Sequence, residues 1–215
     1  MSAPYSLIID TSTNAHLLLI DNMGQCLQEA LESGRGAAEA LQTRLSEFLQ
    51  RQNAKVSDIG KIYIACGPGS FTGLRVGIAY IQGLTFQSET QVYAYSSLLP
   101  LKLLLGNRLG VALIPAKKGS YYVEINDVHA EKNEEHLLSE LELSEFLSRY
   151  PYIATPEPDL LPEELCTHKN LLCYLPEYPY QLIVRHFANA ASIKAKDIKA
   201  NYILKSAAEI HFENK

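Results

Sequence analysis

The residue pattern with the clearest chemical potential is a glycine-rich turn, Gly67–Ser70, placed directly before an apolar run. Pro68 fixes a turn, Gly67 and Gly69 permit positive φ angles, and Ser70 or Thr72 is suited to cap a following helix. Free amides at the start of a helix form a binding site for anions. The same residues also suit a tight strand-to-helix turn that holds no ligand, and no P-loop lysine follows them. The pattern leaves both interpretations open.

A carboxylate at the end of the first apolar strand is the second candidate. Asp10 follows an unbroken apolar run and precedes the turn Thr11–Asn14. Kinases that hold metal-bound phosphate at such a place follow the aspartate with a glycine-rich hairpin turn, whose backbone amides reach the phosphate. This turn contains no glycine, which favours Asp10 as a carboxylate that caps its own turn. A vestigial nucleotide or anion site would comprise Asp10, Gly67, Gly69 and Ser70.

Histidine and cysteine do not occur in a metal-binding pattern. None of the six histidines lies three or four residues from another, so the sequence contains no helical pair of histidine ligands. The four cysteines lie far apart or at a spacing that no zinc motif uses. No Gly-x-Ser-x-Gly nucleophile elbow is present. We therefore predict no metal site and no catalytic residue in this chain.

The elements that position these residues follow a regular order in the first half of the chain. Strands are predicted at 5–10, 16–21, 25–31, 61–66 and 91–95, and helices at 36–51, 71–86 and 97–105. Three meandering strands followed by helix, strand, helix, strand and helix are typical of one half of an actin-like, or ribonuclease H-like, α/β architecture. We predict that residues 1–105 form this N-terminal lobe.

The second half is predicted as a smaller, degenerate lobe, residues 106–215. Strands are expected at 111–115, 121–128 and 132–138, and helices at 143–149 and 180–195. A polar tail that begins with a short extended piece is expected over 196–215. The stretch Pro151–Pro179 holds six prolines, so any strands within it must be short and joined by loops.

The helix predicted at 71–86 has two unlike faces. One face suits packing on a sheet; it comprises Phe71, Leu74, Ile78 and Ile81. The opposite face is small or apolar, where a solvent-facing helix would be polar. Glycine costs about 1 kcal/mol in a helix, so Gly73 and Gly77 indicate close approach of another backbone. That backbone belongs either to a partner protein or to this chain. On the first alternative, a bulky residue at Gly77 weakens association without lowering the melting temperature.

Composition excludes several classes of protein. Hydrophobic residues make up 47% and charged residues 20%, which is ordinary for a globular chain. The net charge of −5 argues against nucleic acid binding by the chain alone. The N-terminus has no basic region before an apolar run, and the apolar runs are too short to span a membrane. We expect a cytoplasmic protein with no membrane contact.

Gly67–Gly77 reads GPGSFTGLRVG and closely resembles the signature Gly-Pro-Gly-Ser-Phe-Thr-Gly-Leu-Arg-(Ile/Val)-Gly of the TsaB/YeaZ family. The resemblance extends along most of the chain. Ile8–Thr13 resembles the opening strand of the family, Ala112–Val123 its mid-chain Ile-Asp-Ala-Arg-x-Gly-Glu-Val-Tyr region, and Ala200–Lys205 its closing Pro-x-Tyr-Leu-Arg. The stretch Pro151–Pro179 matches nothing in this pattern.

The resemblance implies an actin-like ATPase fold of two lobes, with mixed sheets flanked by helices. It implies a role in forming threonylcarbamoyladenosine in tRNA beside TsaD, the catalytic paralogue, and TsaE, an ATPase, with a homodimer where TsaD is absent. The helices predicted at 36–51 and 71–86 would form the interface. Its residues would be Ala37, Leu41, Phe71, Thr72, Gly73, Val76, Gly77, Tyr80 and Leu84.

The resemblance also bears on ligands. It implies no cofactor on the chain alone, ATP or ADP only at the interface with TsaD, and tRNA reached indirectly through the complex. A basic run near the C-terminus is either a solvated face or a minor contact to tRNA; it comprises Lys194, Lys196, Lys199 and Lys205.

The chain departs from the family pattern at a few positions. Ala37 stands where a histidine is usual, Pro115 replaces an aspartate, Ser120 replaces a glutamate, and Tyr80 stands where a small alanine is usual. Two functions therefore compete. One is a non-catalytic scaffold that holds TsaD in its active shape, and the other is a small actin-like phosphotransferase or ATPase with its own nucleotide site. The glycine-free turn after Asp10 and the absent carboxylate favour the scaffold.

Overall fold

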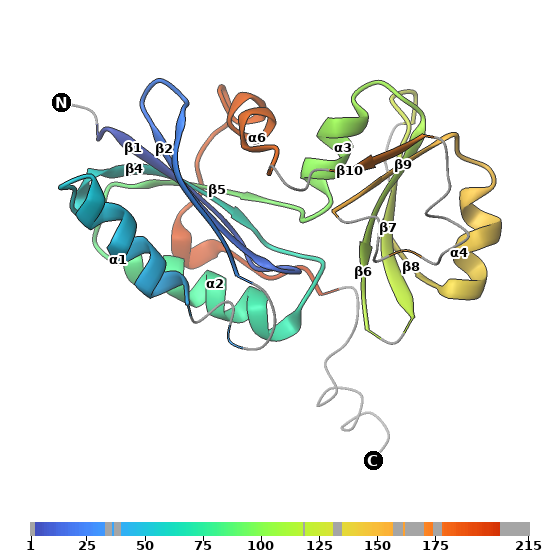
Figure 1. Cartoon of the computed structure of the whole chain (residues 1–215), viewed down its shortest axis with the longest axis horizontal. Coiled ribbons are helices and arrows are strands. Elements are labelled where there is room, and N and C mark those ends of the chain that lie inside the picture. The colour runs from blue at the N-terminus through green and yellow to red at the C-terminus, as the bar shows by residue number, and fades with distance from the viewer. Residues whose placement is uncertain are drawn as a thin grey trace, which may run out of the picture. The chain divides into compact units, whose positions relative to one another are not determined.

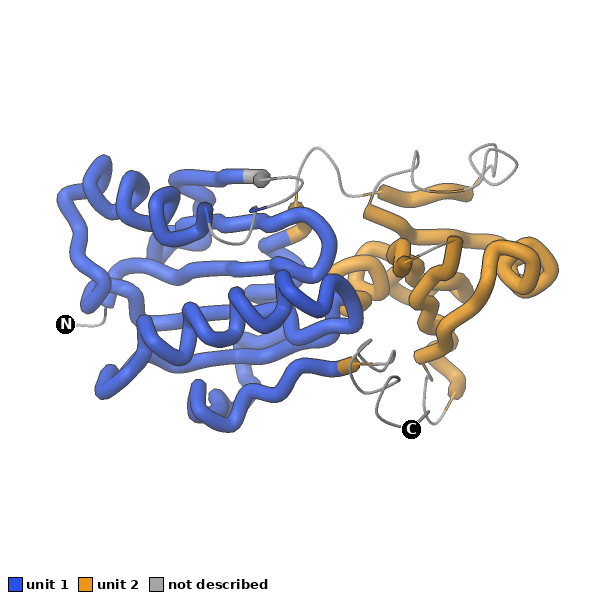
Figure 2. Tube along the Cα trace, turned by 90° about the horizontal axis from the view of Figure 1, so that it is seen from below, with its two compact units in different colours: residues 1–97, 180–201 blue, residues 98–179, 202–215 orange. Residues whose placement is uncertain are grey.

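The chain forms two compact units, and their boundary differs from the predicted one. The computed structural model describes residues 3–32, 36, 40–117, 119–130, 135–156, 161, 170–173 and 178–202. The first unit comprises residues 1–97 and 180–201, and the second comprises 98–179 and 202–215 (Figure 2). The predicted boundary after residue 105 is corrected in two respects. Helix α3 (Leu99–Leu105) packs on strands of the second unit, and residues 180–201 return to the first.

A five-stranded mixed sheet with the order β3-β2-β1-β4-β5 forms the centre of the first unit. Strands β1 (Tyr5–Asp10), β2 (Ala15–Asp21) and β3 (Cys26–Glu32) form the predicted antiparallel meander. Strand β4 (Ile59–Ala65) pairs with β1, and β5 (Gln91–Tyr95) pairs with β4, both in parallel. The unbroken apolar runs in β1 and β2 follow from burial on both faces of the sheet.

Helices α1 (Leu41–Arg51) and α2 (Phe71–Leu84) lie along one face of this sheet (Figure 1). A 3₁₀ turn, η1 (Val56–Asp58), leads from α1 into β4. The helix predicted from residue 36 begins only at Leu41. Gly36 has a φ of 85°, which lies outside the helical region. Helix α2 begins at Phe71, because Ser70, one of the two caps that the sequence offered, caps its first turn through its hydroxyl.

Aromatic side chains cover the other face of the sheet. The rings of Tyr63 and Tyr93 stack at 5.1 Å, and Phe187 lies 5.9 Å from Tyr63 and 5.5 Å from Tyr93. Phe187 follows helix α6 (Tyr180–His186), which lies on the side of the sheet opposite α1 and α2 (Figure 1). The return of this segment removes an aromatic surface from water, which explains why it belongs to the first unit.

The second unit is built on a five-stranded sheet with the order β10-β9-β6-β7-β8. Strands β6 (Gly110–Pro115), β7 (Ser120–Asn126) and β8 (Glu135–Ser139) are antiparallel, and β9 (Tyr152–Thr155) and β10 (Leu171–Cys173) are the short strands expected of the proline-rich stretch. Helix α4 (Glu140–Leu147) packs on β7 and β8 and begins earlier than predicted, at a capping box of Ser139 and Glu142. The structure thus has two mixed α/β sheets flanked by helices, as predicted.

Candidate functional site

The turn between β1 and β2 holds a buried carboxylate. Asp10 is 1% exposed, and its Oδ1 accepts hydrogen bonds from the Ser12 amide at 2.9 Å and the Ser12 hydroxyl at 2.6 Å. Thr11 and Ser12 are buried as well. Asp10 therefore caps its own turn, which is the interpretation that the glycine-free turn favoured. Sequence reasoning missed Ser12, although a serine two residues after an aspartate is a typical turn signal.

The glycine-rich loop packs directly on this turn. The Ser70 amide donates to the Ser12 carbonyl at 2.6 Å, and a Cβ added to Gly69 would lie 2.3 Å from the same oxygen. On the other side, the Gly67 amide donates to the Ser97 hydroxyl at 3.1 Å, and the Ser97 amide donates to the Gly67 carbonyl at 2.9 Å. The chain itself thus binds the loop on both sides.

The first turn of α2 is engaged in the same way. The Gly73 amide donates to the Ser70 hydroxyl at 3.2 Å. The structure does bring together the residues of the predicted anion site, namely Asp10, Gly67, Gly69 and Ser70. However, the amides of Gly67, Ser70 and Gly73 all donate to acceptors of the chain itself. A phosphate at this place would have to displace the carbonyl of Ser12.

Gly73 and Gly77 face the first unit itself. A Cβ on Gly73 would lie 2.2 Å from the Thr11 carbonyl oxygen, and a Cβ on Gly77 would lie 2.5 Å from Thr11 Oγ1. Gly77 is buried beneath this contact. The close approach that the glycines indicated is present, but it is made by the β1–β2 turn of the same chain. The assignment of Gly77 to an outward face is wrong.

The other predicted interface residues divide into four groups. Leu41 is 1% exposed and belongs to the core of the first unit, so it is unavailable to a partner. Ala37 lies outside the described residues. Phe71, Val76, Tyr80 and Leu84 are half-buried, and Tyr80 and Leu84 pack partly against the core. Thr72 is exposed.

A different set of residues forms the exposed surface of α2. The outer face of α2, as defined here, comprises Thr72, Arg75, Ala79 and Gly83. The Arg75 guanidinium lies 3.9 Å from the centroid of the Phe71 ring. A Cβ on Gly83 would meet no atom within 4 Å. Sequence reasoning missed Ala79, although its spacing from Thr72 and Gly83 follows the helical period.

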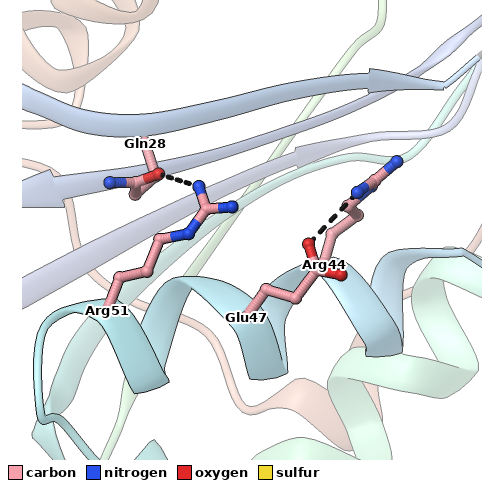
Figure 3. Close-up of polar contacts among 4 residues, drawn as sticks. All are labelled: Gln28, Arg44, Glu47 and Arg51. Carbon is pink, nitrogen blue, oxygen red and sulfur yellow. Dashed lines mark hydrogen bonds and ion pairs between the residues drawn. The ribbon is translucent and has the colours of Figure 1, made fainter.

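The outward face of α1 is polar. Arg44 pairs with Glu47 along the helix, and Arg51 donates a hydrogen bond to the Gln28 side chain of β3 (Figure 3). The two contacts measure 3.1 Å and 3.0 Å, respectively. The second contact links the end of α1 to the edge strand of the sheet. Of the two helices, α2 therefore presents the surface with the small residues Ala79 and Gly83.

The pKa values of two buried side chains near Asp10 are shifted. Burial lowers the pKa of His16, against the opposing effect of the Asp10 carboxylate. Burial, together with the charge of Asp10, raises the pKa of the Cys66 thiol to about 12. The thiol therefore stays protonated, and the thiolate that a nucleophilic cysteine needs does not form. Within the described ranges, no group of three or more His, Cys, Asp or Glu side chains could hold a metal ion.

Sequence comparison matches the chain to proteins whose names refer to threonylcarbamoyladenosine in tRNA. The family model described as "TsaD: tRNA N6-adenosine threonylcarbamoyltransferase" matches residues 32–107. The tRNA threonylcarbamoyladenosine biosynthesis protein TsaB of Escherichia coli (strain K12) is 28% identical over 120 residues, which are 54% of this chain and 52% of that protein. TsaB of Haemophilus influenzae is 29% identical over 92 residues, 43% of this chain and 39% of that protein. The match spans about half the length of these relatives, or less.

Solved structures match over nearly the whole chain. YeaZ from Pseudomonas aeruginosa gives a TM-score of 0.67 at 21% identity, covering 94% of this chain and 100% of that chain. A second Pseudomonas aeruginosa structure, of an uncharacterized protein with similarity to peptidase YEAZ, gives 0.70 at 22% identity, covering 95% and 100%. The chain is thus similar to TsaB and YeaZ proteins, in sequence over about half of its length and in fold over nearly all of it. The predicted two-lobed actin-like, or ribonuclease H-like, fold is thereby confirmed.

Two departures from the TsaB/YeaZ pattern lie at one hairpin of the second unit. Pro115 ends β6, Ser120 begins β7, and the Ala116 amide donates to the Ser120 carbonyl at 2.7 Å. These two positions of the hairpin therefore lack the carboxylates of the TsaB/YeaZ motif that the chain resembles.

Within the described part of the chain, no helix is both long and apolar enough to cross a membrane.

Proposed function

We propose that the chain is a non-catalytic scaffold in the machinery that forms threonylcarbamoyladenosine in tRNA, where it pairs with a TsaD-type catalytic subunit beside a TsaE-type ATPase. The names of its TsaB relatives support the process, and the TsaD family match over residues 32–107 supports kinship with the proposed partner. The proposal places the chain in the cytoplasm, with tRNA held mainly by the partner.

The non-catalytic role is supported by the glycine-rich loop Gly67–Ser70, where the chain itself fills the space that a phosphate would need. The Ser12 carbonyl lies 2.6 Å from the Ser70 amide and fills the space beside Gly69. The Oδ1 atom of Asp10 accepts both hydrogen bonds from Ser12. A nucleotide, ATP or ADP, therefore belongs at the interface with the TsaD-type partner and not on the isolated chain.

The isolated chain releases phosphate from ATP at the background rate, because the amides of Gly67, Ser70 and Gly73 already donate to acceptors of the chain itself. A phosphate-release assay on purified chain checks this prediction. The contrary result is turnover above background that disappears in a folded Asp10→Asn variant, with folding verified by circular dichroism. That result would replace the scaffold with the alternative, a small actin-like phosphotransferase.

We assign partner binding to the outer face of α2. Ala79 and Gly83 allow another helix to approach closely, and Thr72 and Arg75 lie on the same exposed side. Arginine is enriched in protein interfaces, and the stacking of Arg75 on Phe71 orients its guanidinium before binding. In the absence of a TsaD-type partner, two copies of this face are proposed to pair about a two-fold axis.

Replacing Ala79 with tryptophan weakens binding to the TsaD-type subunit about tenfold or more, since overpacking a close contact costs roughly 1–3 kcal/mol. The melting temperature stays nearly unchanged, because Ala79 is exposed in the free chain. Sedimentation of the mixed subunits measures the affinity, and sedimentation of the chain alone measures self-association, which should weaken as well.

The matched control is Leu141→Trp, at a side chain on α4 that is 90% exposed. This variant adds a comparable aromatic surface elsewhere and should retain full affinity. If Ala79→Trp binds the TsaD-type subunit as tightly as the control, the outer face of α2 is not the interface.

A further inference from the structure

A lysine-bearing segment of the first unit has no role in the site described above. We define the basic strap as residues 193–201. It carries three exposed lysines, Lys194, Lys196 and Lys199, and a single acidic side chain, Asp197. Its formal charge is therefore positive on a chain whose net charge is −5. The charge of this segment is opposite in sign to that of the protein around it.

The basic strap is held firmly on the first unit. Its hydrogen bonds join the Ile193 amide to the Val92 carbonyl (2.8 Å), Gln82 Nε2 to the Ala195 carbonyl (3.2 Å), and the Asn201 amide to the Cys66 carbonyl (2.6 Å). Ile198 is 6% exposed and belongs to the core that α1 and α2 cover. A short 3₁₀ turn, η3 (Ala195–Asp197), lies against α2. The predicted polar tail from residue 196 is thus a packed segment as far as residue 201.

The inward residues of the strap anchor it, and the lysines point outward. Lys194, Lys196 and Lys199 form no ion pair with another described residue. Three like charges on a fixed backbone repel one another, and Asp197, the one acidic side chain of the strap, offsets only part of this repulsion. A polyanionic partner would bring the missing counter-charge.

The composition of the strap favours nucleic acid over an acidic protein. Lysine is depleted in protein interfaces, which centre on aromatic side chains and arginine. The strap has neither of these, and its one exposed large apolar side chain is Ile193. Lysine is a compact, mobile charge that suits a phosphate backbone. We propose that the basic strap contacts the phosphate backbone of the tRNA on which the complex acts. This inference rests on the proposed function and gives the chain a direct contact with the RNA.

The test uses the reconstituted complex and the triple variant Lys194→Gln, Lys196→Gln, Lys199→Gln. At about 0.15 M salt the affinity for tRNA should fall about tenfold or more, and the slope of log K against log salt should become shallower by roughly two, since each lost phosphate contact removes about 0.7–0.9. The matched control replaces three exposed lysines outside the strap by glutamine, namely Lys55, Lys61 and Lys117. The control should keep the wild-type affinity and slope.

Assembly with the TsaD-type subunit is measured separately, without RNA. Normal assembly with weaker tRNA binding and a shallower slope supports the strap as an RNA contact. Lost assembly identifies it instead as a contact to an acidic protein and overturns the inference. Normal assembly with unchanged tRNA binding overturns the inference and leaves the proposed function intact. If the wild-type chain itself does not assemble, the proposed function fails. In that case the role of the strap is tested on the isolated chain, by its binding to labelled tRNA at low salt. Binding that does not depend on the three lysines overturns the inference as well.

Discussion

Gly73→Ala lowers the free energy of unfolding by about 3 kcal/mol, whereas Gly83→Ala on the same helix leaves it unchanged or raises it by up to about 1 kcal/mol. The added methyl group at position 73 would lie 2.2 Å from the Thr11 carbonyl oxygen, and at position 83 it would meet nothing within 4 Å. A backbone oxygen cannot move aside without breaking the β1–β2 turn. Both variants gain helix propensity, so their difference isolates the contact with Thr11.

Gly77→Ala provides an intermediate step in this series. Its methyl group would lie 2.5 Å from Thr11 Oγ1, which belongs to a side chain and makes no hydrogen bond with another described residue. Rotation of the Thr11 side chain relieves part of the clash, so the loss should be smaller than at Gly73. Urea unfolding of the three variants under one set of conditions measures the order. Equal stability of Gly73→Ala and Gly83→Ala would refute the packing of α2 on the turn.

The second large effect concerns a buried ion pair in the second unit. Lys102 Nζ on α3 contacts Glu124 Oε1 on β7 at 2.5 Å, with side chains that are 21% and 9% exposed. Lys102→Met leaves the Glu124 carboxylate buried without its cation. We expect a loss of about 2–3 kcal/mol at neutral pH, below the 3–5 kcal/mol typical of a fully buried pair, because Lys102 keeps some access to water.

The loss should depend on pH in a defined direction. Burial already raises the pKa of Glu124, an effect that Lys102 opposes, so removing Lys102 raises this pKa further. A carboxyl group with a raised pKa in the folded state contributes most stability at low pH and loses that contribution as the pH rises through the folded-state value. The stability gap between Lys102→Met and wild type should therefore be small in acid and widen toward neutral pH.

The double variant Lys102→Met, Glu124→Gln serves as the control, because it removes the buried charge as well as its partner. Its stability should recover most of the loss and vary little with pH compared with Lys102→Met. Unfolding curves at several pH values measure both quantities. A gap that stays constant from acid to neutral pH would show that the destabilisation comes from lost packing and not from the stranded carboxylate.

The sequence by itself determined the elements whose signals lie in neighbouring residues. Strand β1 was predicted at its observed bounds, Tyr5–Asp10, because an apolar run and the turn after it are local features. The glycine-rich turn predicted a helix start capped by Ser70 or Thr72, and Ser70 is the residue that caps α2. The capping role of Asp10 followed from the absence of glycine in its turn. The TsaB/YeaZ signature was likewise a contiguous stretch, Gly67–Gly77, and it led to the family and the fold.

Only the tertiary structure decided what those residues contact. A glycine in a helix indicates that something approaches closely, but its missing side chain carries no information about what approaches. Thr11, which lies over Gly73 and Gly77, is far from both in the sequence. For the same reason, the polar composition of residues 196–201 suggested a tail, although Ile198 and Asn201 hold this segment on the first unit. Local patterns set the strands and helices, whereas the choice between own-chain packing and a free surface depends on contacts between distant residues.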